Sequence, residues 1–309
     1  MSRETKPKSN LDKRFDLIRD REVFGYNPKE SGNRAFKKLK SNRLAVIGLI
    51  FVLAIIFTSI FAPLFTKYNP QKVDLRNMLK PPSAEHILGT DKIGRDIYAR
   101  IIYGGRISIL VGLGSALGAA LIGVSIGAYT GYRGGWWDSI FLRISEIVMS
   151  FPQIILVLLL VTILGQSLMN LIIIFTLTGW GSLYRMTRAQ MLSLREEEYV
   201  QALRAFGLSR PRICFKHILP NALGPIMVNI TLSTAMFILQ EAGLSFLGLG
   251  VPLNIPTWGN ILNVAQDLRI LQNYWWVWLP SGITISLFVL AINFVGDGLR
   301  DSTDPTLHG

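Results

Sequence analysis

The sequence has little of the chemistry on which enzymes and metal sites depend. Of its 309 residues, one is a cysteine, Cys214, and three are histidines. This count rules out an internal disulfide framework and most cysteine metal sites. The G-x-x-x-x-G-K-[ST] loop that cradles ATP phosphates is also missing, so we expect no ATP site of that kind in this chain. We identify no catalytic residue, predict no metal site and expect no enzymatic activity.

Long apolar runs dominate what is present. Half of the residues are hydrophobic, the formal net charge is +12 and the mean hydropathy is +0.37. A soluble nucleic-acid-binding protein could share the charge but not the hydropathy. Runs of about 20 apolar residues predict membrane helices, and the first begins too deep in the chain for a cleavable signal. We predict an all-α integral membrane protein with six spans, at about 44–65, 107–129, 139–164, 168–184, 223–247 and 274–295.

Two spans carry further local signals. In the second, small residues such as Gly123 and Gly127 recur on one surface, which favours close contact with another helix. In the third, Pro152 predicts a kink.

The polar segments between the spans set the expected topology. We expect an N-terminal segment 1–43, a six-helix membrane region 44–296 and a tail 297–309. Loops 66–106 and 248–273 would lie on one side of the membrane and loop 185–222 on the other. Lys and Arg are concentrated in the first segment and in loop 185–222, which predicts cytoplasmic termini in a multi-pass membrane protein. Within the first outer loop, the pattern over 86–106 predicts a short amphipathic helix at the interface.

The polar stretch 196–221 predicts a helix–turn–helix outside the bilayer. Periodicity favours a helix over 199–206 with Tyr199, Ala202, Leu203 and Phe206 on one face, ended by Gly207. Ser209 and Pro211 suit the start of a second helix, which we expect Pro220 to close. A tip made of small and apolar residues is suited to enter a groove on another protein.

This stretch resembles a known family. Gln201-Ala202-Leu203, then Gly207, then Leu219-Pro220 resemble the EAA loop of ABC-importer permeases, although the family's Glu is Gln201 and its second Ala is Leu203. The resemblance implies a coupling helix that docks on a cytoplasmic ATPase. The implied docking residues are Gln201, Ala202, Leu203, Ala205, Phe206, Gly207, Leu208, Ser209, Leu219 and Pro220.

Three longer stretches narrow the family. HILGTDKIGRDIYARIIYGGRISILVG, EAGLSFLGLG and NFVGDGLRDSTDP, beginning at His86, Glu241 and Asn293, are similar to the C-type permease subunit of dipeptide and oligopeptide importers. The resemblance implies a type I ABC importer permease fold, a place in a bacterial cytoplasmic (inner) membrane and a heterodimer with a B-type permease. It also implies two ATPase subunits that bind ATP and Mg, and an extracytoplasmic peptide-binding protein. Nickel importers belong to the same branch, so peptides, nickel or another small solute remain open as substrates.

One acidic residue in the spans has two readings. Glu241 is placed near the outer end of the fifth span, where it could face the transport pathway or brace the outer loop near Thr257, Trp258 and Gly259. Two other classes of protein remain as alternatives: an ion-coupled secondary transporter and a membrane enzyme. The first should carry paired intramembrane charges or inverted repeats, and the second a cluster of carboxylates or histidines. The sequence offers neither pattern.

Overall fold

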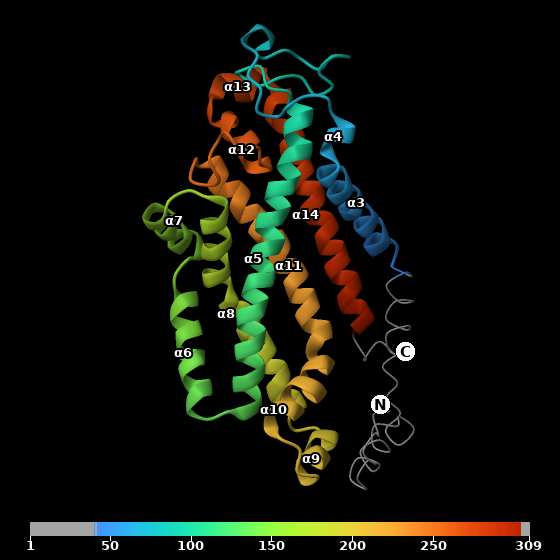
Figure 1. The fold of residues 1–309 in the computed structure, drawn as a ribbon, viewed down its shortest axis with the longest axis vertical. Coiled ribbons are helices and arrows are strands. Elements are labelled where there is room, and N and C mark those ends of the chain that lie inside the picture. The colour runs from blue at the N-terminus through green and yellow to red at the C-terminus, as the bar shows by residue number, and fades with distance from the viewer. Residues whose placement is uncertain (1–39, 41, 304–309) are drawn as a thin grey trace, which may run out of the picture.

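The chain is helical throughout the part that the structure describes. The computed structural model describes residues 40 and 42–303, and within these residues helices and loops occur without a β-strand (Figure 1). The predicted all-α class is confirmed. Most of the basic segment 1–43 and the end of the tail 297–309 lie outside the described residues.

Four helical stretches are long and apolar enough to cross a membrane. They are α3 (Arg43–Ile60), α5 (Ile97–Arg133), the stretch Arg210–Phe246 that contains α11 (Leu219–Phe246), and α14 (Trp275–Thr303). Each contains at least one window of 18 residues with few charges. Because each is helical, its backbone hydrogen bonds are satisfied within the helix, as a lipid environment demands.

The expected third span is broken rather than kinked. It forms α6 (Trp136–Ser150) and α7 (Gln153–Leu164), which meet at an angle of 88°. Phe151 and Pro152 between them have extended backbone, with ψ of 140° and 120°. A proline disfavours the helical conformation of the residue before it, so the break takes up both residues, and α7 lies beyond the end of α6 and turns away from its line (Figure 1). The two helices can count as one bent span.

The expected fourth span, α8 (Leu168–Leu194), is longer than predicted but less apolar than the others. Polar residues such as Asn170 and Arg185 dilute its apolar stretch, so it falls outside the set of candidate spans. The described residues therefore hold four candidate spans, or five with the bent pair, and the predicted number of six is not reproduced exactly.

Helix α5 forms the centre of the bundle and packs most extensively on α8. Glycines allow this approach: a Cβ atom on Gly123 would lie 2.6 Å from the Trp180 carbonyl oxygen, and one on Gly127 would lie 2.7 Å from that of Tyr184. Both distances are too short for a real side chain. The small-residue surface predicted for the second span therefore does bring two helices together, and the main hydrophobic core forms around it.

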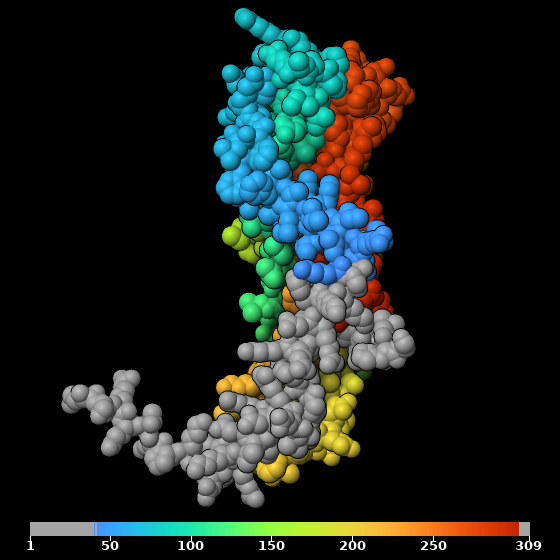
Figure 2. All heavy atoms as spheres, turned by 90° about the vertical axis from the view of Figure 1, so that its right-hand side faces the viewer, coloured from blue at the N-terminus to red at the C-terminus, as the bar shows by residue number. Residues whose placement is uncertain are grey.

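Helices α3 and α14 close the other side of the bundle. They pack on each other, and a Cβ atom on Gly48 would lie 2.7 Å from the Ala291 carbonyl oxygen. Figure 2 shows α3 in blue on the face of the molecule that points toward the viewer. Large apolar side chains of α3, such as Ile47 and Ile50, are more than half exposed in the chain alone, as expected of a surface that faces lipid or another subunit.

At the end of the bundle opposite the loop 196–221, called the outer end after the predicted topology, loops and short helices form an ordered cap (Figure 1). The first loop contains α4 (Ala62–Phe65) and a 3₁₀ turn at Leu75–Asn77. The second contains α12 (Trp258–Leu262), a 3₁₀ turn at Asn263–Gln266 and α13 (Leu268–Asn273). The expected separate helix over 86–106 is wrong: residues up to Asp96 form a loop, and α5 begins at Ile97 and continues unbroken into the span.

Buried charges explain why this loop ends where it does. The Asp96 carboxylate caps α5 by accepting a hydrogen bond from the Ala99 amide at 2.7 Å, and it contacts His86 Nδ1 at 2.8 Å. The Asp91 carboxylate accepts hydrogen bonds from Arg95 Nε and Arg100 Nη1, each at 2.7 Å. The cap at Asp96 satisfies a free amide at the start of α5, so the helix begins here rather than earlier.

Candidate functional site

The first limb of the loop 196–221 ends in a tight glycine turn. Helix α9 (Glu198–Ala205) is followed by Gly207 with φ of +75°. The Gly207 amide donates to the Arg204 carbonyl oxygen at 2.9 Å, and the Leu208 amide donates to that of Leu203 at 3.3 Å. These two bonds form a Schellman motif, which requires a residue in the left-handed conformation at this position. The prediction that Gly207 ends the helix is confirmed.

The tip is exposed, and the buried face of α9 differs from the predicted one. Val200 and Leu203 point into a small core beneath the loop, whereas Phe206 is 49% exposed. Leu203 therefore holds α9 in place, although it was expected among the docking residues. The exposed residues on the expected docking list are Gln201, Ala205, Phe206, Gly207, Ser209 and Pro220, with Ala202, Leu208 and Leu219 half-buried.

The second limb does not end at Pro220, contrary to the prediction. A short helix, α10 (Arg210–Arg212), passes through a π-helical turn at Ile213–Ile218 into α11, which begins at Leu219. Pro220 lies in the first turn of α11, where its missing amide is tolerated. The wider π turn carries the chain past the proline, and the Leu219 amide donates to the Cys214 carbonyl oxygen. The tip is thus continuous with a membrane helix.

Several contacts fix this limb and α9 to the bundle. Arg204 lies over the Tyr132 ring, 5.2 Å from its centroid, and donates from Nε to the Tyr132 hydroxyl oxygen at 3.3 Å. The Cys214 thiol donates to the Ala128 carbonyl oxygen at 3.4 Å. Arg204 therefore holds α9 against the end of α5.

Glu241 lies in a buried polar cluster that joins α11, α5 and the second outer loop. Its carboxylate accepts hydrogen bonds from the hydroxyls of Ser245 at 2.7 Å and Ser108 at 3.2 Å. The Ser108 oxygen in turn accepts a bond from the Trp258 amide at 3.1 Å. Glu241 is fully buried in the chain. Of its two predicted roles, this geometry favours bracing the outer loop.

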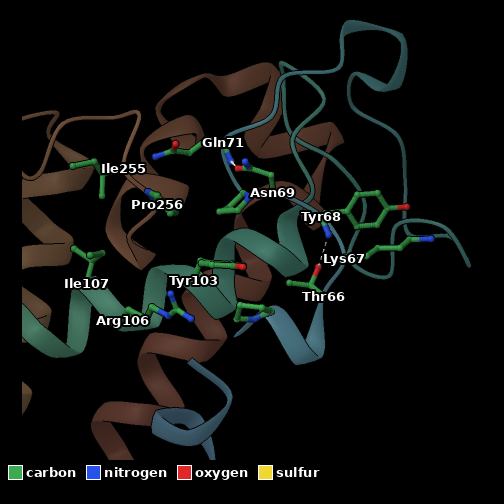
Figure 3. Close-up of a pocket in the computed structure, with 12 residues that line it drawn as sticks. Thr66, Lys67, Tyr68, Asn69, Gln71, Tyr103, Arg106, Ile107, Ile255 and Pro256 are labelled. Carbon is green, nitrogen blue, oxygen red and sulfur yellow. Dashed lines mark hydrogen bonds between the residues drawn. The ribbon is translucent and has the colours of Figure 1, made fainter. Parts of the chain in front are cut away.

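A hollow of about 620 Å³ opens at the outer end between the first outer loop, α5 and the second outer loop (Figure 3). Tyr103 and Arg106 of α5 lie along one side of it, with Asn69 and Gln71 opposite. Arg106 donates to the carbonyl oxygens of Ser59 at 2.5 Å and Ile60 at 2.7 Å. Those bonds use the guanidinium to hold the end of α3, and the other cation of the lining, Lys67, lies over the Tyr68 ring, 5.3 Å from its centroid.

The sequence-based reasoning missed the ion pair that fixes α6. Asp138 accepts two hydrogen bonds from Arg188 of α8, both at 2.6 Å. A bidentate pair of this kind is among the stronger polar contacts in proteins. The available signal was an acidic residue in the first turn of a helix that opens with Trp136 and Trp137, but no spacing rule links position 138 to position 188.

Comparison with known proteins places the chain in a family. Residues 123–309 match the family described as binding-protein-dependent transport system inner membrane component. Residues 32–82 match the N-terminal TM domain of oligopeptide transport permease C. The dipeptide transport system permease protein DppC of Alkalihalophilus pseudofirmus is 44% identical over 88% of this chain and 89% of its own length. The oligopeptide transport system permease protein OppC of Bacillus subtilis is 43% identical over 89% of each chain.

A solved structure shares the fold. A chain from the inward-facing MetNI methionine ABC transporter superposes with a TM-score of 0.51 at 18% identity, covering 66% of this chain and 96% of that one. Its sequence is too distant to carry more than the architecture. The family match extends over more than half of the chain and includes the whole helix–turn–helix. Together with the identity to the two permeases, it shows that this chain belongs to the family of binding-protein-dependent transport system inner membrane components.

Proposed function

We propose that this chain is the membrane permease subunit of an ATP-driven importer of dipeptides or oligopeptides. The relatives described above are permeases for such peptides, which supports this substrate over nickel. The observation that carries the proposal is the exposed tip around Gly207, which is continuous through the π turn with α11. A partner that grips the tip would hold one end of a long membrane helix.

The proposed mechanism moves this helix. ATP and Mg bind to two cytoplasmic ATPase subunits, and closure of the ATPases carries the tip with it. Because α10, the π turn and α11 form one helical stretch from Arg210 to Phe246, displacement of the tip passes directly toward the outer cluster at Glu241. A second, B-type permease completes the pathway, and an extracytoplasmic binding protein delivers peptide to the outer cap. Glu241 serves as a brace for this cap in the proposed assembly.

The proposed orientation puts both termini and the loop 185–222 in the cytoplasm. The supporting observation is the excess of Lys and Arg in the segment 1–43 and in that loop. The ordered outer cap would then lie outside the membrane, where a binding protein can reach it.

Uptake by cells tests the function. A strain that lacks the gene for this chain, but keeps the rest of the importer, should fail to accumulate a labelled dipeptide or tripeptide. Restoring the gene should restore uptake, whereas nickel accumulation should be the same in both strains. Restored nickel uptake without peptide uptake would reassign the substrate, and unchanged uptake of both would reject the proposal.

A further inference from the structure

A second hollow lies inside the bundle at the bend between α6 and α7. It has a volume of about 440 Å³, is lined by residues of α6, α7, α8 and α11, and is open on the side where Phe151, Ser182 and Met236 are exposed. The space exists because the break at Pro152 turns α7 away from the line of α6. A straight helix would place its side chains elsewhere. Broken helices of this kind create binding sites in the membrane parts of other transporters.

The polar lining of this hollow is uncharged. It consists of three amide and three hydroxyl side chains: Gln153, Asn229 and Gln240, and Thr178, Ser182 and Ser233. Amides and hydroxyls both donate and accept hydrogen bonds and carry no fixed charge. Imidazole, a ligand that suits nickel, does not occur among the described residues that line it. The lining therefore favours a neutral polar ligand over a metal ion.

Two of these amide side chains, one on α7 and one on α11, form a hydrogen bond beside the bend. Gln240 Nε2 donates to Gln153 Oε1 at 3.0 Å, which links α11 to α7. The Oε1 atom of Gln240 is buried, and no described residue donates to it. A buried amide oxygen without a donor is costly. The N–H group of a ligand in the hollow would satisfy this oxygen.

The spacing along α11 matches an extended chain. Asn229, Ser233 and Gln240 are separated by four and seven residues, which places them on one face of the helix. At a rise of 1.5 Å per residue, Asn229 and Gln240 are about 16 Å apart along the axis. An extended peptide of about five residues covers the same length.

We propose that this hollow binds the main-chain amide groups of a short extended peptide and accepts side chains of either charge. The inference rests on the proposed function and adds the chemical group that is recognised. Main-chain amides are common to all peptides, so a neutral site that pairs with them is selective for peptides as a class. Selection among side chains would take place elsewhere in the importer.

Introducing a charge into the hollow tests this inference. Gln240→Glu and Gln153→Glu place a carboxylate in the hollow from two different helices, so the test does not depend on one variant folding. Gln272→Glu makes the same change at an exposed position of α13. Cells that express the complete importer with each variant are given labelled tripeptides that differ only in a central Asp, Ala or Lys. Uptake is divided by the wild-type uptake of the same peptide, which removes the selectivity of the binding protein.

The expected result is an acquired charge preference. Both hollow variants should reduce uptake of the Asp peptide by about tenfold relative to the Lys peptide, because a carboxylate in the hollow repels the Asp side chain and attracts the Lys side chain at close range. Gln272→Glu should leave the ratio unchanged. Equal effects on all three peptides in variants that reach the membrane would overturn the inference. If the wild-type importer takes up none of the peptides, the proposed function itself fails.

Discussion

Replacing Gly207 by aspartate separates the docking role of the loop from its fold. Gly207 has φ of +75°, and a Cβ atom built on it meets nothing within 4 Å. An L-residue in this conformation costs roughly 1–2 kcal/mol, and no clash within the chain adds to that cost. Membrane proteins and domains of ordinary stability, about 5–15 kcal/mol, tolerate a loss of this size. Gly207→Asp should therefore insert into the membrane and pair with the second permease.

The open space beside Gly207 is the space that the proposed ATPase groove would fill. A carboxylate there would lose its water against the ATPase and gain no opposite charge in return. Its extra volume would also destabilise a packed contact. We expect Gly207→Asp to abolish uptake of a labelled peptide. The assay compares uptake with the amount of permease in membranes by blot and with co-purification of the second permease and the ATPase.

Gly135→Asp is the matched control. Gly135 also has a positive φ, +77°, and nothing lies within 4 Å of its Cβ position, but it belongs to the turn before α6. It should retain uptake because it lies outside the loop, even though its ψ of −153° places it in a region that L-residues adopt less readily than the αL conformation of Gly207, so its backbone strain is at least as large. Normal uptake by Gly207→Asp would refute the reasoning, because the tip would then not be a coupling contact. Equal loss in both variants would trace the effect to strain.

Four further outcomes are expected. The purified chain alone should not hydrolyse ATP, and activity that survives removal of contaminating ATPases would contradict this. Ser83→Cys, made with Cys214→Ser, should react with an impermeant thiol reagent in intact cells, because Ser83 is exposed in the outer loop. Reaction only after lysis would show that the topology is the reverse of the one proposed. Gly127→Val should lower the free energy of unfolding in detergent by about 1–3 kcal/mol, since its Cβ would lie 2.7 Å from a backbone oxygen. Gly243→Val should have little steric effect, because nothing lies within 4 Å of the Cβ position of Gly243. Arg204→Ala should reduce uptake only mildly, because the partly buried contact with Tyr132 that is lost is worth about 1 kcal/mol.

The features that were predicted correctly depend on short-range chemistry. Gly207 was identifiable because a helix that ends in an αL residue needs glycine there, whatever surrounds it. The contact surface of α5 was identifiable because small residues at regular spacing leave room for a neighbouring backbone. Apolar run length gave most of the spans. In each case the residues that cause the structure lie within a few turns of one another.

The features that were missed depend on how neighbouring segments respond to a proline. Pro152 breaks its span by 88°, whereas Pro220 is absorbed into a continuous helix. The sequence shows the same missing amide at both positions. The difference lies in a π turn before Pro220 and in an extended Phe151 before Pro152, which local pattern does not reveal. The amide pair of Gln153 and Gln240 was missed for a related reason, since it forms only once the break has occurred.

The glycine contact between α5 and α8 also limits how the bundle can move. Gly123, Gly127 and Gly131 recur every four residues. A Cβ atom on any of them would touch the backbone of α8. A slide of half a turn would bring larger side chains of α5 against the same carbonyl groups, so displacement is restricted to full-turn steps of about 5.4 Å. We therefore expect α5 and α8 to move together as one rigid unit. In the proposed mechanism, displacement of α9 would therefore have to move α11 relative to this pair, and the distance between labels on α5 and α8 should stay constant through the transport cycle.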